Sequence, residues 1–88
     1  MQSYIFKITG RVQGVWYRKT ICTNAKKAGF NGYVKNLKDG SVEAGVSLDN
    51  EIYNTFISIL EQGSIVSKVE NITYVFTDEV FINGFEIR

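Results

Sequence analysis

The chain has 88 residues, of which 44% are hydrophobic and 22% charged, a balance typical of a small globular domain and not of a disordered chain. It contains one cysteine and no histidine, which excludes an internal disulfide and argues against a zinc site or a histidine general base. We therefore expect a single domain over residues 1–88, with no metal ion and no cofactor.

Two elements are predicted in the first third of the chain. Residues 3–11 are expected to form a strand, because apolar side chains recur at every second position. Residues 17–28 are expected to form a helix, because apolar side chains recur at steps of four, four and three and Gly29 follows as a C-terminal cap. The positions that define these two patterns are Tyr4, Phe6, Ile8, Tyr17, Ile21, Ala25 and Ala28.

A β-hairpin is predicted next, with strands over residues 30–36 and 41–48. The connection ends in Asp39-Gly40, a dipeptide that favours the backbone conformations of tight hairpin turns. Within the second strand, alternate apolar residues share one face, which we expect to be buried. These residues are Val42, Ala44, Val46 and Leu48.

The second half of the chain predicts one more helix and two more strands. Asp49 is the expected N-cap of a helix that runs to about Gln62 and is ended by Gly63. Its apolar face comprises Tyr53, Phe56, Ile57 and Leu60. A fourth strand is expected within residues 67–77, and residues 84–88 form a short segment that can pair along a sheet edge.

The predicted order is β-α-β-β-α-β with a short tail, which places the chain in the α+β class. This is the arrangement of ferredoxin-like folds, a four-stranded antiparallel sheet with both helices on one face. We expect the C-terminal tail to add a short edge strand to that sheet.

Residues 10–18, with the sequence GRVQGVWYR, have the features of an anion-binding loop. Gly10 and Gly14 let the backbone bend so that successive N–H groups converge on one point. A helix begins directly afterwards, and the N-terminus of a helix attracts negative charge. Arg18 adds a planar guanidinium suited to phosphate oxygens. A nucleotide P-loop is excluded, because Val15 stands where Lys would follow the second glycine.

Asn36, at the end of the second predicted strand, is the other candidate site residue. Its neutral amide can hold a water molecule or a carbonyl group. Each candidate also has a purely structural interpretation. The glycines can be ordinary turn residues, Arg18 can be a solvated helix residue, and Asn36 can cap the strand before the hairpin.

The joint pattern resembles the acylphosphatase family, whose members hydrolyse carboxyl-phosphate anhydrides. The similar segments are residues 10–18, GYVKN at 32–36, DGSVE at 39–43 and FEIR at 85–88. The resemblance implies that Arg18 and Asn36 are catalytic, and that the loop backbone binds the phosphoryl group. The loop residues concerned are Arg11, Val12, Gln13, Gly14, Val15 and Trp16.

The resemblance also implies a mechanism and partners. Arg18 and the loop N–H groups would hold the phosphoryl oxygens, and Asn36 would orient the attacking water. Because the chain has no histidine, we expect a phosphate oxygen of the substrate to accept the proton of the water. The expected ligands are an acyl phosphate and inorganic phosphate; the sequence does not identify the physiological acyl group.

Charge is unevenly distributed along the chain. Residues 1–40 carry eight basic side chains and one acid, whereas residues 41–88 carry two basic side chains and eight acids. This pattern can steer an anionic substrate toward the loop, or it can draw the two halves together in the fold. Because the chain is small and its net charge of +1 is nearly balanced, we expect a monomer.

The remaining predictions concern the location of the protein and its alternative functions. No signal-peptide pattern is present, and no apolar run approaches the roughly 20 residues that span a bilayer, so we expect a cytoplasmic protein without a membrane partner. One alternative is an RNA-binding module of the same topology; residues 27–34 loosely resemble its basic-aromatic motif. That motif belongs on a third strand and here falls on the second. The other rival is a non-catalytic anion-binding domain.

Overall fold

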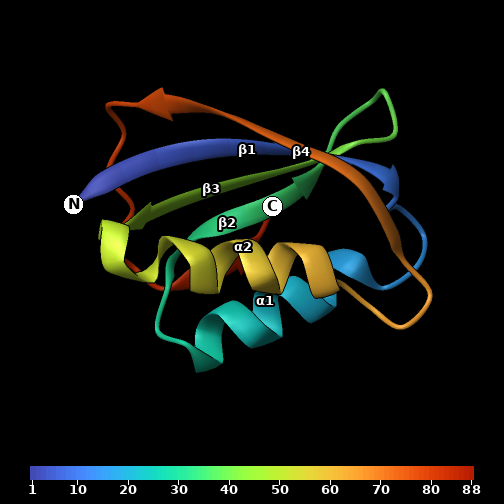
Figure 1. Cartoon of the computed structure of the whole chain (residues 1–88), viewed down its shortest axis with the longest axis horizontal. Helices are drawn as coiled ribbons and strands as arrows, with labels where there is room; N and C mark the ends of the chain where they lie inside the picture. The colour runs from blue at the N-terminus through green and yellow to red at the C-terminus, as the bar shows by residue number, and fades with distance from the viewer.

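The computed structural model describes all 88 residues, which form one sheet covered on one face by two helices (Figure 1). In chain order the elements are β1 (Gln2–Arg11), α1 (Tyr17–Lys27), β2 (Asn31–Asn36), β3 (Val42–Leu48), the 3-10 helix η1 (Asn50–Ile52), α2 (Tyr53–Gln62), β4 (Lys68–Thr77) and β5 (Phe85–Ile87). The element order confirms the predicted ferredoxin-like fold.

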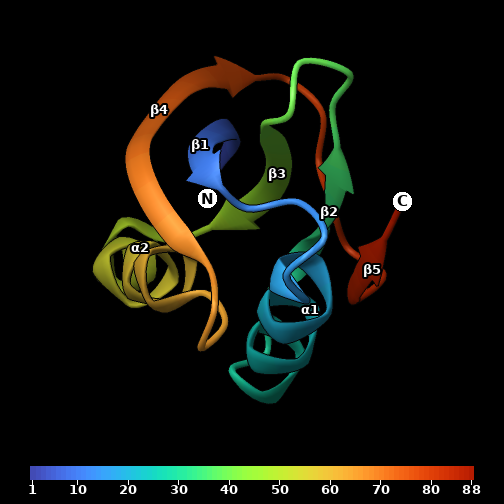
Figure 2. The same cartoon turned by 90° about the vertical axis from the view of Figure 1, so that its right-hand side faces the viewer.

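The sheet contains five strands in the order β4-β1-β3-β2-β5, which can be followed from one edge to the other in Figure 2. The first four are antiparallel, as predicted. The short strand β5 pairs along the free edge of β2, and it does so in parallel. The C-terminal segment therefore returns to the edge of the sheet opposite β4 and lies beside the strand that carries Asn36.

The core lies between the sheet and the two helices. The period-two prediction for β1 is confirmed, because Tyr4, Phe6 and Ile8 are at most 5% exposed and belong to a cluster of 18 buried residues. The alternate residues of β3 that were predicted to share a face are also buried. Neither α-helix combines the length and the apolar composition that crossing a bilayer requires.

Two predictions about helix ends were wrong. Ala28 was expected to be the last residue of the first helix and part of its apolar pattern, but α1 ends at Lys27, and Ala28 is its exposed C-cap. Asp49 was expected to cap the second helix. It precedes η1 without a capping hydrogen bond, and its carboxylate lies 3.5 Å from the N-terminal ammonium group. The short 3-10 turn delays the start of α2 to Tyr53.

Candidate active site

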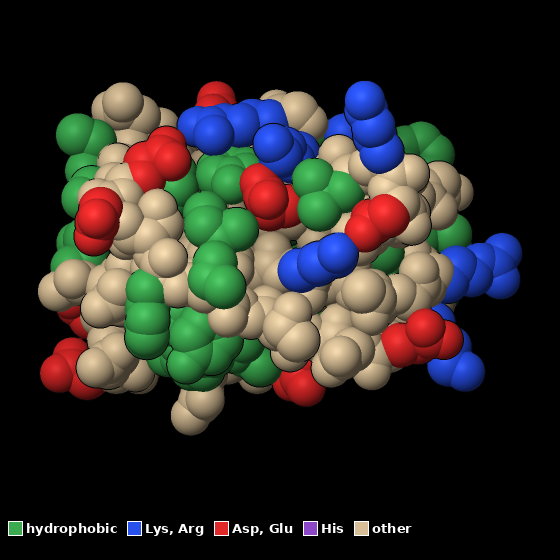
Figure 3. Space-filling view, turned by 90° about the horizontal axis from the view of Figure 1, so that it is seen from above, with side chains coloured by type: hydrophobic (Ala, Val, Ile, Leu, Met, Phe, Trp, Pro, Cys, Tyr) green, Lys and Arg blue, Asp and Glu red, His purple; other side chains and the backbone are tan.

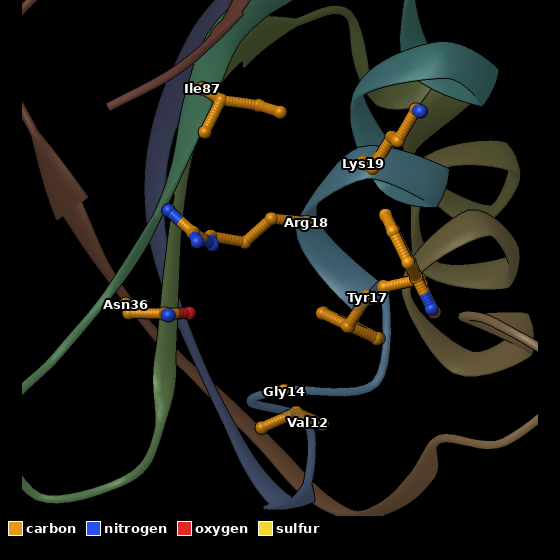
Figure 4. Close-up of a pocket in the computed structure, with 8 residues that line it drawn as sticks. Val12, Gly14, Tyr17, Arg18, Lys19, Asn36 and Ile87 are labelled. Atoms are coloured by element: carbon orange, nitrogen blue, oxygen red, sulfur yellow. The ribbon is translucent and has the colours of Figure 1, made fainter.

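The register of the sheet turns Asn36 toward the helices. Asn36 pairs with Val42, and Val34 pairs with Ala44; both partners are fully buried on the helix-facing side of β3. Because alternate residues of a strand share a face, Asn36 extends toward α1 at the point where β2 ends. Arg18, in the first turn of α1, points its guanidinium toward the strand that carries Asn36 (Figure 4). Two residues 18 positions apart in the sequence thus face one another.

A cavity of about 390 Å³ lies between these two side chains. Its lining comprises Val12, Gly14, Trp16, Tyr17, Arg18, Lys19, Asn36 and Ile87. Five of the residues proposed from the sequence therefore meet at one cavity, namely Val12, Gly14, Trp16, Arg18 and Asn36. The cavity combines one guanidinium, one ammonium and one amide with an apolar floor, a composition suited to a small anion with an apolar part.

Three of the proposed loop residues do not line this cavity. Arg11 is the last residue of β1, where it pairs with Lys68 and leaves its side chain exposed. Val15 turns its side chain into the core, where it is 6% exposed. Gln13 points its side chain toward the β2–β3 hairpin instead.

The two glycines of the loop have different places. Gly14 lines the cavity with a φ of 70°, a left-handed conformation that glycine adopts without strain. Gly10 lies within β1, where the register with β4 shifts, and a Cβ there would come within 2.2 Å of the Lys68 carbonyl oxygen. Gly10 thus permits the close approach of two strands, and its φ of 124° is one that glycine adopts without strain. It is not among the residues that line the cavity.

The start of α1 presents unpaired donors to the cavity. The first hydrogen bond across this end of the helix runs from the Thr20 N–H to the Trp16 carbonyl, at 3.0 Å. The N–H groups of the residues between them have no partner within the helix, as at every helix N-terminus. No acidic side chain occupies the first turn. These donors and the helix dipole therefore favour an anion at this end.

Arg18 adds a positive charge that no acid of the chain neutralises. The half-buried guanidinium takes part in none of the four ion pairs in the structure. Asn36 is also free, because its side chain makes no hydrogen bond within the protein. A charged planar donor and a neutral amide thus face the same space, and both are available to a ligand.

The hairpin that follows Asn36 is tied to the loop by Gln13. Its Nε2 donates to the carbonyl oxygens of Leu37 and Ser41, at 2.7 Å and 2.8 Å. The hairpin is further braced by Asp39, whose carboxylate lies 2.8 Å from the Lys7 ammonium. Hydrogen bonds from Lys7 and then from Ser41 hold the pKa of Asp39 well below its usual value of 3.8, so that it stays ionised at neutral pH.

Gln13→Ala should therefore loosen the hairpin that carries Asn36. We expect an unfolding free energy lower by about 1–2 kcal/mol, because two partly buried hydrogen bonds are lost. We also expect a kcat lower by roughly tenfold, because Asn36 is no longer held in register with the loop. Urea unfolding and steady-state kinetics measure the two effects. Gln2→Ala is the matched control, since Gln2 makes only a 3.4 Å contact with a neighbouring carbonyl. Wild-type kcat in Gln13→Ala would contradict the positioning role.

Three lining residues were not predicted as site residues. Tyr17 anchors α1 to α2, because its buried hydroxyl donates to the Leu60 carbonyl at 2.7 Å; burial raises the pKa of this phenol above its usual value of 10.0. Ile87 lies on β5, and the only sequence feature that could have identified it as a site residue is its place in the C-terminal FEIR segment. Lys19 follows Arg18 directly, and nothing in the pattern distinguished it from a surface lysine.

Comparisons with known proteins show the family of the chain. A family model described as Acylphosphatase matches residues 4–87. The acylphosphatase of Picrophilus torridus is 40% identical over 85 residues, which cover 97% of this chain and 98% of that protein. That of Thiobacillus denitrificans is 35% identical over 88 residues, covering 100% and 98%. The crystal structure of acylphosphatase from Bacillus subtilis matches with a TM-score of 0.90 at 31% identity, over 100% of this chain and 99% of that one.

Proposed function

We propose that Arg18 and Asn36 catalyse the reaction of the acylphosphatase family, to which this chain belongs. The chain hydrolyses acyl phosphates to a carboxylate and inorganic phosphate, and the two residues act in the cavity at the start of α1. One observation supports the assignment above the others. An arginine without an acidic partner and an amide without a protein hydrogen bond line the same cavity, beside the free N–H groups of a helix N-terminus.

The phosphoryl group of the substrate binds at the positively charged end of this cavity. The phosphoryl group carries its charge on oxygens that match the planar fork of Arg18. The N–H groups of the loop and of the first turn of α1 supply further donors, with Gly14 giving the backbone its approach to the ligand. Donors held in place before the reaction stabilise the charge that develops in the transition state without reorganisation.

Hydrolysis then requires an aimed water molecule. Asn36 faces the phosphoryl site from the sheet side, and its amide can hold the water for attack on phosphorus. The new P–O bond forms as the bond to the acyl oxygen breaks, and the bonding electrons leave with the carboxylate. A phosphate oxygen accepts the proton of the water, so that the products are a carboxylate and inorganic phosphate. Such phosphoryl transfer depends mainly on positioning and electrostatics.

We propose that neither a covalent intermediate nor a metal ion is involved. The cavity is lined by no serine, cysteine or carboxylate, and the Tyr17 hydroxyl is bonded to a backbone carbonyl. No three His, Cys, Asp or Glu side chains gather into a group that could hold a metal ion. Direct attack by water, with positive charge from Arg18, is the chemistry that the lining supports.

The test follows the oxygen of the attacking water. We expect benzoyl phosphate hydrolysed in oxygen-18 water, with a chelator present, to place the label in inorganic phosphate and none in benzoate. The ³¹P isotope shift and the mass of the benzoate measure the two products. Turnover that stops with the chelator would contradict the metal-free mechanism. Label in the benzoate would show attack at the carbonyl carbon and remove the proposed role of Asn36.

The comparisons do not favour the RNA-binding alternative, and the surface supports it poorly. RNA-binding sheets of this topology stack bases on aromatic residues of the open face. On β3 that face presents Glu43, Gly45 and Ser47. Figure 3 shows basic and acidic side chains intermixed on this side of the molecule, and Lys35 pairs with Glu43 at 3.6 Å. We propose small anions, and not nucleic acid, as the ligands.

We also propose that residues 1–88 act as one domain, as a monomer and in the cytoplasm. The small size of the chain supports a monomer. The one cysteine, Cys22, is buried in α1, where it needs no disulfide partner, and a reducing compartment suits it.

A further inference from the structure

A second hollow lies beside the phosphoryl site. It has a volume of about 490 Å³, and its lining includes the apolar residues Trp16, Ile65 and Val66 and also Thr20 of α1. Trp16 lines both this hollow and the cavity that holds Arg18 and Asn36. A molecule held in the first cavity can therefore extend into the second across the indole ring. We call the surface of Trp16, Thr20, Ile65 and Val66 the Trp16 shelf.

The shelf consists of large apolar side chains left open to solvent. Trp16 is 70% exposed, Val66 is 55% exposed and Ile65 is fully exposed. None of the three belongs to the hydrophobic core. Exposed apolar groups that gather beside a polar cavity are typical of ligand-binding surfaces.

The backbone of Trp16 adopts an unusual conformation for a bulky residue. Its φ of 65° makes it the only non-glycine residue of the chain in the left-handed region. A bulky residue rarely adopts this conformation, and such strain concentrates at functional sites. The Lys19 ammonium lies 5.5 Å from the centroid of the indole ring and covers part of it.

The other wall of the shelf is fastened to the phosphoryl-binding loop. Ser64, in the segment between α2 and β4, donates a hydrogen bond from its hydroxyl to the Val15 carbonyl. Ser67 closes the same segment by bonding both the N–H and the carbonyl of Ser64. Ile65 and Val66 are thereby carried next to Trp16, although about 50 residues separate them in the sequence.

The in-line geometry of phosphoryl transfer indicates on which side of phosphorus the acyl leaving group lies. In phosphoryl transfer the attacking and leaving oxygens are roughly in line, on opposite sides of phosphorus. Asn36 aims the water from β2, on one side of α1, whereas the segment between α2 and β4 lies on the other side of that helix (Figure 2). The acyl group therefore departs toward the shelf and away from the sheet.

We propose that the Trp16 shelf binds the acyl group of the substrate, and that the enzyme prefers acyl phosphates whose acyl group is aromatic or an extended apolar chain. This inference rests on the proposed roles of Arg18 and Asn36, which place the phosphoryl group in the first cavity. The apolar part of the substrate covers the indole ring and the side chains of Ile65 and Val66, while the carboxyl-phosphate group stays among the donors.

The test compares two substrates that differ in the acyl group, benzoyl phosphate and acetyl phosphate. In the double variant Ile65→Ser, Val66→Ser, we expect the ratio of kcat/KM for benzoyl phosphate to that for acetyl phosphate to fall by about tenfold relative to wild type, because apolar contact with the ring is lost. The comparison of ratios removes the difference in intrinsic reactivity between the two substrates. Trp16→Gly should lower the same ratio, and glycine suits the φ of this position.

Val75→Ser is the matched control, because Val75 is 64% exposed on β4 and lines neither hollow. It should keep the wild-type ratio. Circular dichroism checks that every variant is folded. A ratio that stays within twofold of wild type in both shelf variants would overturn the proposal. Failure of the proposed catalytic roles would be seen elsewhere, as undiminished hydrolysis of either substrate by an Arg18 variant.

Discussion

Arg18→Ala should abolish acyl-phosphate hydrolysis, with kcat/KM lower by a factor on the order of 10³–10⁵, the range seen when an arginine that stabilises phosphoryl-transfer charge is removed. The guanidinium is half-buried at the start of α1 and has no acidic partner. Its positive charge is therefore not offset by the protein, and its loss removes the main charge that faces the phosphoryl oxygens. Initial rates with benzoyl phosphate measure the effect.

Arg18→Lys separates charge from geometry. Lysine keeps the positive charge but replaces a planar fork with a single ammonium, so we expect it to restore little of the lost activity. Lys26→Ala is the control for charge alone, because Lys26 is exposed in the last turn of the same helix, far from the cavity lining. Near-normal turnover by Arg18→Lys would show that Arg18 does not act as a two-pronged donor.

Asn36→Ala should lower kcat by roughly 10²–10³ or more while inorganic phosphate still binds, the effect expected when one oriented polar group is removed from a transition state. Asn36 is exposed at the end of β2, and its side chain makes no hydrogen bond within the protein. Its removal should consequently leave the unfolding free energy within about 0.5 kcal/mol of wild type. Steady-state kinetics, the inhibition constant of phosphate and urea unfolding together test these expectations.

Asn36→Asp distinguishes water positioning from simple polarity. A carboxylate at this position would repel the phosphoryl group, so we expect both kcat and phosphate binding to fall, unlike the result for alanine. Asn24→Ala, in the middle of α1 and outside the cavity, is the matched amide control. If Asn36→Ala loses phosphate binding but still turns over the substrate that does bind, Asn36 is a binding residue. The proposal that it orients the attacking water would then be wrong.

Most elements of the fold could be predicted because their signals are local. Period-two alternation placed Tyr4, Phe6 and Ile8 on the buried face of β1. Glycine marked the ends of both helices, at Gly29 and Gly63. The two errors concern helix ends, which local patterns locate only to within a few residues. Ala28 fits the apolar spacing of α1 but is its C-cap, and Asp49 is a typical N-cap residue but precedes the 3-10 turn η1 and not α2 itself.

The candidate site was predictable for a similar reason. Arg18 and Gly14 belong to one continuous segment, so the sequence itself brings an arginine next to a loop and a helix start. To predict the direction of the Asn36 side chain, the pairing of β2 with β3 is also needed. Alternation along β3 determines which face of β2 is buried, and therefore toward which side Asn36 points.

The sequence by itself determined the order of the elements, their buried faces and the identity of the two polar residues at the cavity, because each depends on neighbours a few positions away. Tertiary structure alone decided what surrounds those residues. The parallel return of β5 places Ile87 in the cavity wall, Gln13 reaches the hairpin, and Ser64 fastens the segment after α2 to the loop. These contacts join residues that are distant along the chain, and they depend on strand register and loop conformation, which no local pattern encodes.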